Sequence, residues 1–481
     1  MKSRRFFSVI FLMAAMQYTS LAQDNAEKYS SLSLQQCIDI AIQNNTDVQT
    51  RKLNQESAEV GLQTSKGNML PTVNAGITHG TNHGRSIDPF TNTYINQNVS
   101  FANYNLSSGV VLFNGFSIQD DIKSNKLAVQ ASHEETQQVK DNLALNVILA
   151  YLTVLTNQDL LSQAEKQKAV TEKQVNRLET LNANGAVNPS QLYDLKGQLA
   201  ADELSIVNTR NNLNSSILTL TQLMNIPYSN SISFERVTVP EAIIRKEVPA
   251  DSIYQMAAAN LAVLKAAELR KQSADFAVKA NRASRFPSIS LNGGLFTNYS
   301  SVASSLNYVN TTEVETGNYV VIDGNEVPVL TKQDNYSSSK LSYGDQFKNN
   351  FNTSVSIGIN IPLLNGLQTK ARIRNAQIQQ KQATINAEAA RITLQQNTSQ
   401  ASMNMQASAD RFEVLQKQKD AFTQSFDVAS TRLESGVINT VEYLIAKNNL
   451  DRASSNLIIS QYDYILRAMM LDYYTGVLSF K

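Results

Sequence analysis

The sequence predicts a mainly α-helical chain that is internally duplicated and contributes strands to a transmembrane β-barrel. Three observations predict this fold class. The second half of the chain repeats the first in register. Each half holds a helix-forming stretch of about 67 residues that lacks proline and glycine. Each half also holds two segments in which apolar and small or polar residues alternate.

The duplication defines the structural unit. Residues 112–226 realign with residues 363–477 at a constant offset of 251, which pairs Gly185 with Gly436. Upstream the offset is 216 and pairs Pro71 with Pro287, so the second copy carries 35 extra residues between Pro287 and Leu363. The insertion indicates a place that tolerates a loop. We expect repeats at 23–226 and 252–481 and a connector at 227–251.

Residues 1–22 are typical of a signal peptide. Three basic residues precede an apolar run at 6–16, and the small residues Ser20 and Ala22 suit cleavage before Gln23. A membrane anchor is the weaker reading, because a span needs roughly 20 apolar residues. The single cysteine, Cys37, lies beyond that site and can neither accept a lipid there nor form a disulfide within the chain.

Charge excludes nucleic acid as a partner. The leader takes three of the 42 Lys and Arg residues and none of the 41 Asp and Glu residues, which leaves a net charge of −2. Beyond the leader no run of about 18 apolar residues occurs, so any membrane insertion must use strands.

Strands are expected at about 71–84 and 99–113 in the first repeat and at about 287–299 and 347–362 in the second. In the clearest case Val355, Ile357 and Ile359 alternate with Ser356 and Gly358. This pattern fits a lipid-facing barrel wall, although a soluble hairpin has the same pattern. Four strands cannot close a barrel, so the chain must oligomerise, and a trimer supplies twelve strands with a lumen where a dimer supplies only eight.

Long helices are expected at 117–183, 189–225, 252–285, 368–435 and 440–474, with hairpin tips at 184–189 and 435–440. Apolar residues or tyrosines recur every seven positions along the two return helices. A 3.5-residue period indicates coiled-coil packing, and an ordinary antiparallel bundle is the alternative. The ten positions are Leu192, Leu199, Ile206, Leu213, Leu220, Tyr443, Leu450, Leu457, Tyr464 and Leu471.

These features together resemble the TolC-like outer-membrane efflux proteins. The resemblance rests on Ser33-Leu34 and Ala41 in the first helix, on strands ending in Leu112-Phe113-Asn114-Gly115 and Leu363-Leu364-Asn365-Gly366, and on the tips Asn184-Gly185-Ala186-Val187 and Ser435-Gly436-Val437-Ile438. It implies a homotrimer that forms a 12-stranded β-barrel in the outer membrane, continued by a 12-helix coiled-coil tunnel in the periplasm. Residues 227–251, with strand-like pieces such as 231–237, would belong to a belt around the tunnel.

The resemblance also implies functional positions at the hairpin tips. Glu442 and Ile445 match two aspartates that ring the periplasmic aperture, and Asp194 is the first-copy equivalent of Ile445. For Glu442 an ordinary helix-terminal acid is an equally good interpretation. The family's lock positions hold Leu433, Ile438 and Gln191, so the lock must differ. Docking of a periplasmic adaptor is expected at the tips, whose residues are Gly185, Ala186, Val187, Gly436, Val437 and Ile438.

The sequence shows no pattern of residues that is typical of a catalytic site. The histidines are His79, His83 and His133, and the first two are four apart in a strand and loop, which disfavours a metal site. Cys37 fits a small core residue. We therefore expect no enzyme, cofactor or metal, but a passive exit duct that works with a periplasmic adaptor and an inner-membrane pump. Type I protein secretion is an alternative within this class, an exported structural coiled coil is the rival, and a porin would need more strands per chain.

Overall fold

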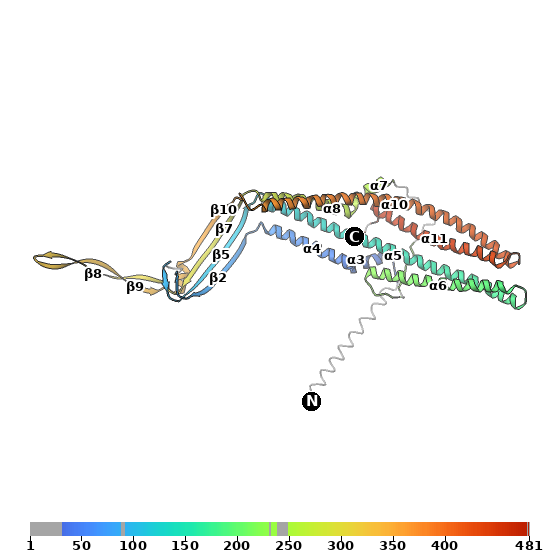
Figure 1. Cartoon of the computed structure of the whole chain (residues 1–481), viewed down its shortest axis with the longest axis horizontal. Helices are drawn as coiled ribbons and strands as arrows, with labels where there is room; N and C mark the ends of the chain where they lie inside the picture. The colour runs from blue at the N-terminus through green and yellow to red at the C-terminus, as the bar shows by residue number, and fades with distance from the viewer. Residues whose placement is uncertain (1–30, 88–91, 230–231, 238–248, 479, 481) are drawn as a thin grey trace, which may run out of the picture. The chain divides into compact units, whose positions relative to one another are not determined.

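The computed structural model describes residues 31–87, 92–229, 232–237, 249–478 and 480. The signal-peptide prediction and most of the connector therefore lie outside the described residues. The chain divides into two compact units. Figure 1 labels the helices and strands that they contain. Unit 1 comprises residues 1–60, 126–274 and 379–481, and unit 2 comprises residues 61–125 and 275–378. Each unit contains segments of both repeats, so the duplication does not divide the chain into one compact body per repeat.

The helices reproduce the duplication residue for residue. Helices α3 (Leu34–Asn44) and α4 (Thr46–Gly67) recur 216 positions later as α7 (Ala250–Asn260) and α8 (Ala262–Ala283). Helices α5 (Ser117–Ala183) and α6 (Pro189–Met224) recur 251 positions later as α10 (Gln368–Glu434) and α11 (Thr440–Thr475). The single helix expected at 252–285 is thus two helices, because the backbone of Leu261 is extended.

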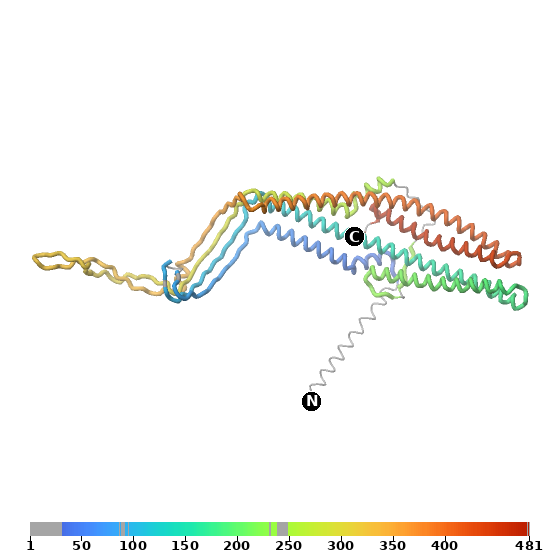
Figure 2. Tube along the Cα trace, viewed as in Figure 1, coloured from blue at the N-terminus to red at the C-terminus, as the bar shows by residue number. Residues whose placement is uncertain are grey.

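Unit 1 is built from two long helical hairpins, α5–α6 and α10–α11, whose tight turns are visible in the Cα trace of Figure 2. Its main core gathers apolar residues of α3, α5, α6, α7, α10 and α11. There the hydroxyl of Tyr151 donates to the carbonyls of Leu32 (3.0 Å) and Glu235 (2.6 Å). These carbonyls flank the short parallel pair β1 (Ser31–Leu32) and β6 (Ser233–Phe234), which this hydroxyl ties to α5.

The heptad column on the return helices packs inward. None of its ten residues is exposed, and Leu220, Tyr443 and Leu471 are buried completely or nearly so. Helix α5 also contains a segment apolar enough in composition to cross a membrane, but 56% of that segment is buried. Its residues Val147, Ile148 and Leu155 lie in the main core, which is the ordinary place for such a helix in a water-soluble domain.

Unit 2 contains an antiparallel four-stranded sheet with the order β10-β7-β5-β2. The strands are β2 (Thr72–Asn82), β5 (Val99–Phe113), β7 (Ser288–Ser300) and β10 (Asn352–Asn360). The strand expected at 347–362 is wrong at its start, because Tyr343–Asn349 form helix α9. That helix is held against β7 by Gln346, whose side chain binds both the N–H and the carbonyl of Ser300.

The 35-residue insertion is not a plain loop. It forms a long antiparallel hairpin of β8 (Ser304–Ile322) and β9 (Asn325–Lys340), which pair with each other. A smaller hairpin, β3 (Arg85–Ile87) and β4 (Tyr94–Asn96), connects β2 to β5. Helices α4 and α8 precede the starts of β2 and β7, and the two hairpins follow the ends of these same strands. The hairpins therefore lie at the end of the sheet away from these helices.

Candidate functional site

The four-stranded sheet has one apolar face and one small, polar face. The register brings Ala75 opposite Leu106, Leu106 opposite Leu295, and Leu291 opposite Ile357, all on one face. On the other face Ser, Asn and Gly residues oppose one another, as in the pair Gly109 and Asn292. The apolar face is uncovered in the single chain, with Val355 81% exposed and Ile77 74% exposed. This is the pattern of a barrel wall with lipid outside and water inside.

Aromatic residues mark both ends of this apolar band. At the helix end Phe113 packs edge-on against Phe116. At the loop end Tyr104 contacts Phe347, and Tyr299 packs against Tyr343. Nine residues separate Tyr104 from Phe113 along β5, which corresponds to about 30 Å of strand and to about 20–25 Å of height at a tilt near 40°. That height matches the apolar band of an outer-membrane barrel.

Both edges of the sheet, β2 and β10, lack a further strand within the described residues. An open edge leaves a row of unpaired backbone N–H and C=O groups, which cannot be satisfied in lipid. The sheet is therefore complete only when β2 of one copy meets β10 of another.

The two hairpin tips share one construction. Gly185 and Gly436 both have left-handed backbones, with φ of +65° and +71°. Glycine is required at each tip because other residues are strained there. Of the six predicted docking residues, both glycines, Ala186 and Val437 are exposed, whereas Val187 and Ile438 pack into a buried cluster behind the tips.

This cluster joins the two hairpins of one chain. Val175, Leu178, Leu192 and Leu195 of the first hairpin are buried against Tyr443 of α11. The expected lock positions Leu433 and Ile438 pack around it, and Gln191 is half-buried nearby in sequence. Apolar packing thus occupies the region where the resemblance implies a polar lock.

Glu442 is exposed at the first turn of α11. Its N–H donates to the side chain of Asn439 (2.9 Å), whose amide in turn lies 3.3 Å from the Glu442 carboxylate. Ile445, one turn further on, is also exposed, as is Asp194 in the first hairpin. The carboxylate of Glu442 therefore faces solvent in the single chain and also supports the helix cap.

A buried ionic cluster lies next to the apolar cluster and was missed by sequence reasoning. Lys447 of α11 is only 2% exposed at its side chain, and its Nζ lies 3.0 Å from Asp202 of α6 and 2.7 Å from Asp451. Thr171 donates to the same Asp202 oxygen, and Gln198 donates to the other (2.7 Å). The sequence signal was the i, i+4, i+8 series of Tyr443, Lys447 and Asp451, which places all three on one face of α11.

Burial governs the titration of this region. Desolvation raises the pKa of Asp451, and the nearby Asp202 raises it further, while the hydrogen bond from Lys447 lowers it. Burial, helped by the charges of Asp451 and Asp202, raises the pKa of Tyr443 to about 12. The Tyr443 hydroxyl is buried without a hydrogen-bond partner, as is that of Thr440. The contact between the hairpins therefore contains buried ion pairs, but it leaves the hydroxyl groups of Tyr443 and Thr440 without hydrogen bonds.

A further link joins the hairpins close to the second tip. The guanidinium of Arg177 donates to the main-chain carbonyl of Glu434 (2.8 Å), the last residue of α10. A positively charged donor at a helix C-terminus satisfies a carbonyl that the helix leaves free.

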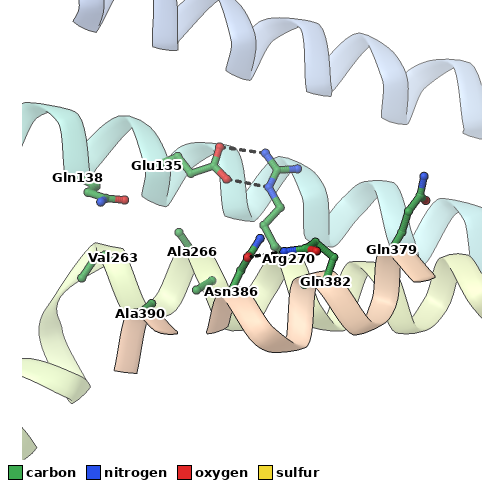
Figure 3. A pocket seen from close by; sticks show the side chains of 11 residues that line it. Glu135, Gln138, Val263, Ala266, Arg270, Gln379, Gln382, Asn386 and Ala390 are labelled. Atoms are coloured by element: carbon green, nitrogen blue, oxygen red, sulfur yellow. Dashed lines mark hydrogen bonds and ion pairs between the residues drawn. The ribbon is translucent and has the colours of Figure 1, made fainter. Parts of the chain in front are cut away.

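Away from the tips, α5, α8 and α10 line a groove with a cavity of about 580 Å³ (Figure 3). Arg270 of α8 reaches across to Glu135 of α5 through two hydrogen bonds of 2.7 and 2.9 Å. The neighbouring side chains are small or amide-bearing, such as Ala266 and Gln382. This ion pair joins a helix of the second repeat to one of the first.

The residues considered for chemistry are not assembled into a reactive site. His79 lies on β2 and His83 follows it, with Nδ1 2.8 Å from the Asn98 side chain. Within the described ranges no three His, Cys, Asp or Glu side chains gather as metal ligands. Cys37 is fully buried in the main core, and desolvation raises the pKa of its thiol to about 12.

Comparison with known proteins agrees with this description. A family model described as "outer membrane efflux protein" matches residues 37–225 and 253–477. No curated protein matches the sequence. Similar solved structures include the outer membrane protein VceC of Vibrio cholerae (13% identity, 92% of this chain and 96% of that chain covered, TM-score 0.74). Others are the outer membrane channels CmeC of Campylobacter jejuni (14%, 93% and 86%, 0.69) and MtrE of Neisseria gonorrhoeae (18%, 92% and 88%, 0.67).

The structural likenesses show the fold, and the family model, which covers most of the chain, shows the family. The predicted fold class is confirmed as that of an internally duplicated, mainly α-helical chain that pairs a four-stranded barrel segment with two long helical hairpins, the fold of the outer membrane channels above. The localisation is the outer membrane with a large periplasmic part, and the function is that of a channel and not of an enzyme. The chain belongs to the outer membrane efflux protein family.

Proposed function

We propose that this channel is the passive exit duct of a tripartite export system, engaged at its hairpin tips by a periplasmic adaptor protein that links it to an inner-membrane pump. The observation that carries the proposal is the matched construction of the two tips. Each ends in a left-handed glycine followed by an exposed apolar or small side chain, Ala186 in one and Val437 in the other. Such a surface lets a second helical hairpin approach closely.

The energy for export must come from the partner, because the described residues offer no catalytic constellation and the family is one of channels. Substrates would pass through the lumen without chemistry. Small-molecule efflux and type I protein secretion would both use such a passive duct. The family assignment favours either one over an exported structural coiled coil.

Between uses the duct must be shut, and the contact between the hairpins is the candidate for holding it. Apolar packing around Tyr443, the buried Lys447 cluster and the Arg177 link all join the first hairpin to the second within one chain. Separating the hairpins would expose the apolar cluster around Tyr443 and break the ion pair between Lys447 and Asp202. These contacts favour the closed arrangement until a docked adaptor offsets them.

Site-specific cross-linking in intact cells tests adaptor docking. A photoreactive residue at Val437, 63% exposed at the tip, is expected to form an adduct with an adaptor of the membrane-fusion type. The matched control is Val428 of α10, which is 59% exposed and lies nine residues before Val437 in the sequence. Adducts from both positions, or from neither while the trimer remains assembled, would contradict docking at the tips.

A further inference from the structure

The inserted hairpin β8–β9 has no role in the barrel wall or in the tips. Its turn, Asp323-Gly324, has left-handed backbone at both residues, with φ of +52° and +89°. This turn type suits a tight two-residue hairpin. In Figure 1 the hairpin extends from the loop end of the four-stranded sheet, within unit 2. Because the helices of this family lie in the periplasm, the loop end of the barrel faces the cell exterior.

Near its turn this hairpin carries apolar residues on both faces, with one acidic residue, Glu326, opposite Val321. In this subsection the hairpin tip means residues 319–322 and 327–330 of the β8–β9 hairpin, which are distinct from the two helical tips described above. The register places Tyr319 opposite Pro328 on one face and Val320 opposite Val327 on the other. Because side chains alternate along a strand, each face carries four apolar residues. They are Tyr319, Val321, Pro328 and Leu330 on face A, and Val320, Ile322, Val327 and Val329 on face B.

These side chains are uncovered in the single chain. Val321 on face A is 60% exposed, and Ile322 on face B is 54% exposed. Within the described residues β8 and β9 form a sheet of two strands only. An isolated two-stranded hairpin is marginally stable in water, and one with two apolar faces needs a cover on each side.

A polar shank separates the hairpin tip from the barrel. Asn310 lies opposite Asn335, and Glu313 lies opposite Lys332. Thr311 additionally donates to the Asp334 carboxylate (2.6 Å). The shank at 310–315 corresponds to about 20 Å of strand, so the apolar tip is not a continuation of the lipid-facing band. Lipid is therefore the weaker candidate for the cover.

Trimer geometry brings three such arms within reach of one another. Twelve strands spaced about 4.8 Å apart and tilted by about 40° enclose a barrel of diameter about 24 Å. The three hairpins then begin about 20 Å apart, because each grows between β7 and the edge strand β10 of its own copy. Each arm is about 50 Å long from the length of β9, so small inclinations bring the tips into contact.

We propose that the hairpin tips of the three copies pack against one another outside the cell, with face A of one copy on face B of the next. A threefold ring gives every tip two neighbours and so covers both faces, whereas one molecule of another protein would cover one face. Such head-to-tail contacts close into a ring under the rotation that the barrel already imposes. The occupant of each apolar face is thus a second copy of this chain.

Disulfide trapping tests this arrangement. In the variant Val321→Cys/Val327→Cys, oxidation is expected to convert the chain into a covalent trimer on denaturing gels. The two thiols of one chain cannot join each other, because residues 321 and 327 lie on opposite faces of the hairpin and their Cβ vectors point apart. The native Cys37 does not interfere, because it is fully buried in the main core.

The matched control is Glu313→Cys/Gln333→Cys in the shank. Residues 313 and 333 have the same diagonal relation across the hairpin as residues 321 and 327. Between bases about 20 Å apart and tips in contact, the shanks stay further apart than the Cα separation of about 7 Å that a disulfide allows. The control is therefore expected to remain monomeric on denaturing gels.

The proposal is overturned if the Val321→Cys/Val327→Cys chain stays monomeric while both thiols react fully with a maleimide, or if its adducts contain another protein. If the double variant fails to assemble, a photoreactive residue replacing Tyr319 in the otherwise native chain gives the same answer. It is expected to form adducts between copies of this chain, and labelling of any other species would count against the contact.

Discussion

Lys447 and its equivalent in the first repeat lie in different surroundings. Its first-repeat equivalent, Lys196, lies 251 positions earlier and makes an exposed ion pair with Glu179 (2.8 Å). Lys447 instead is buried between Asp202 and Asp451. Removing one partner of a buried ion pair is strongly destabilising, whereas an exposed ion pair contributes little to stability. The same residue type therefore matters much more for stability in the second copy than in the first.

Replacing this lysine tests the ionic cluster. Lys447→Met leaves two buried carboxylates without their cation, which is expected to weaken the contact between the hairpins by about 3–5 kcal/mol. Protease sensitivity of the tips and the fraction of open time in planar bilayers should both increase. Lys196→Met is the matched control and should change neither. Equal effects of the two substitutions would contradict a special role for the buried cluster.

Asp451 gives this contact a pH dependence of defined sign. Its pKa is raised by burial, so the packed state binds a proton more readily than the separated state does. Stability that is present in acid is therefore lost as pH rises above the ordinary aspartate value near 4 and through the raised value. We expect the hairpins of the native chain to separate more readily as pH rises across this window.

The variant Asp451→Asn checks the assignment. An amide does not titrate, so the variant should show a flatter pH dependence of tip proteolysis than the native chain. If the native chain and the variant respond to pH in parallel, another group controls the contact.

At the scale of elements, the sheet's two faces differ in their tolerance of charge. Val355 and Ser356 are neighbours on β10 whose side chains point to opposite faces. Val355→Arg places a cation in lipid at an expected cost of about 2–4 kcal/mol near the bilayer midplane. Ser356→Arg faces the water-filled lumen and should leave assembly intact. Trimer yield after membrane extraction distinguishes the two, and equal yields would contradict the assigned faces.

The long helices could be predicted from sequence because their signals are local. The stretch Ser117–Ala183 lacks proline and glycine, and Gly185 and Pro189 mark where one helix ends and the next begins. Helix α9 has a weaker local signal, because it is only seven residues long. It is fixed by Ser342 at its N-cap and by Gln346 reaching Ser300, a contact that depends on the tertiary fold.

The inserted hairpin escaped prediction for a different reason. Period-two alternation indicates a strand with one apolar face, but residues 319–322 read Tyr-Val-Val-Ile and are apolar on both faces. The break between α7 and α8 also lacks the usual signals, since Leu261 is neither glycine nor proline. The hairpin thus lacks the alternating pattern of a half-buried strand, and the helix break lacks a glycine or proline to mark it.

At the scale of the whole molecule, threefold symmetry multiplies each lumen-facing charge. If Glu442 rings the periplasmic aperture, three carboxylates there favour cations. Glu442→Gln is expected to lower the cation selectivity of single channels while keeping the cap, because a glutamine oxygen can still accept from Asn439. Asp194→Asn, the exposed first-repeat control, should leave selectivity unchanged. Unaltered selectivity in Glu442→Gln would make that carboxylate an ordinary helix-terminal acid.

The candidate site was predictable only where it resembles other members of the family. Both tips and Glu442 follow from glycine-marked turns in duplicate register. The buried cluster does not, because Lys447 and Asp202 come from different repeats and meet only when the hairpins pack. The apolar packing around Tyr443 likewise depends on which helix faces meet. The heptad column indicates that these faces are buried but does not identify the partner helix.

The central claim is that one chain supplies a third of a membrane channel, and the mass of the native species tests it most directly. Native mass spectrometry of the protein extracted from the outer membrane in mild detergent should give three chains, because the open edges β2 and β10 must pair between copies. A stable single chain with its sheet folded, recovered outside the membrane, would contradict the account.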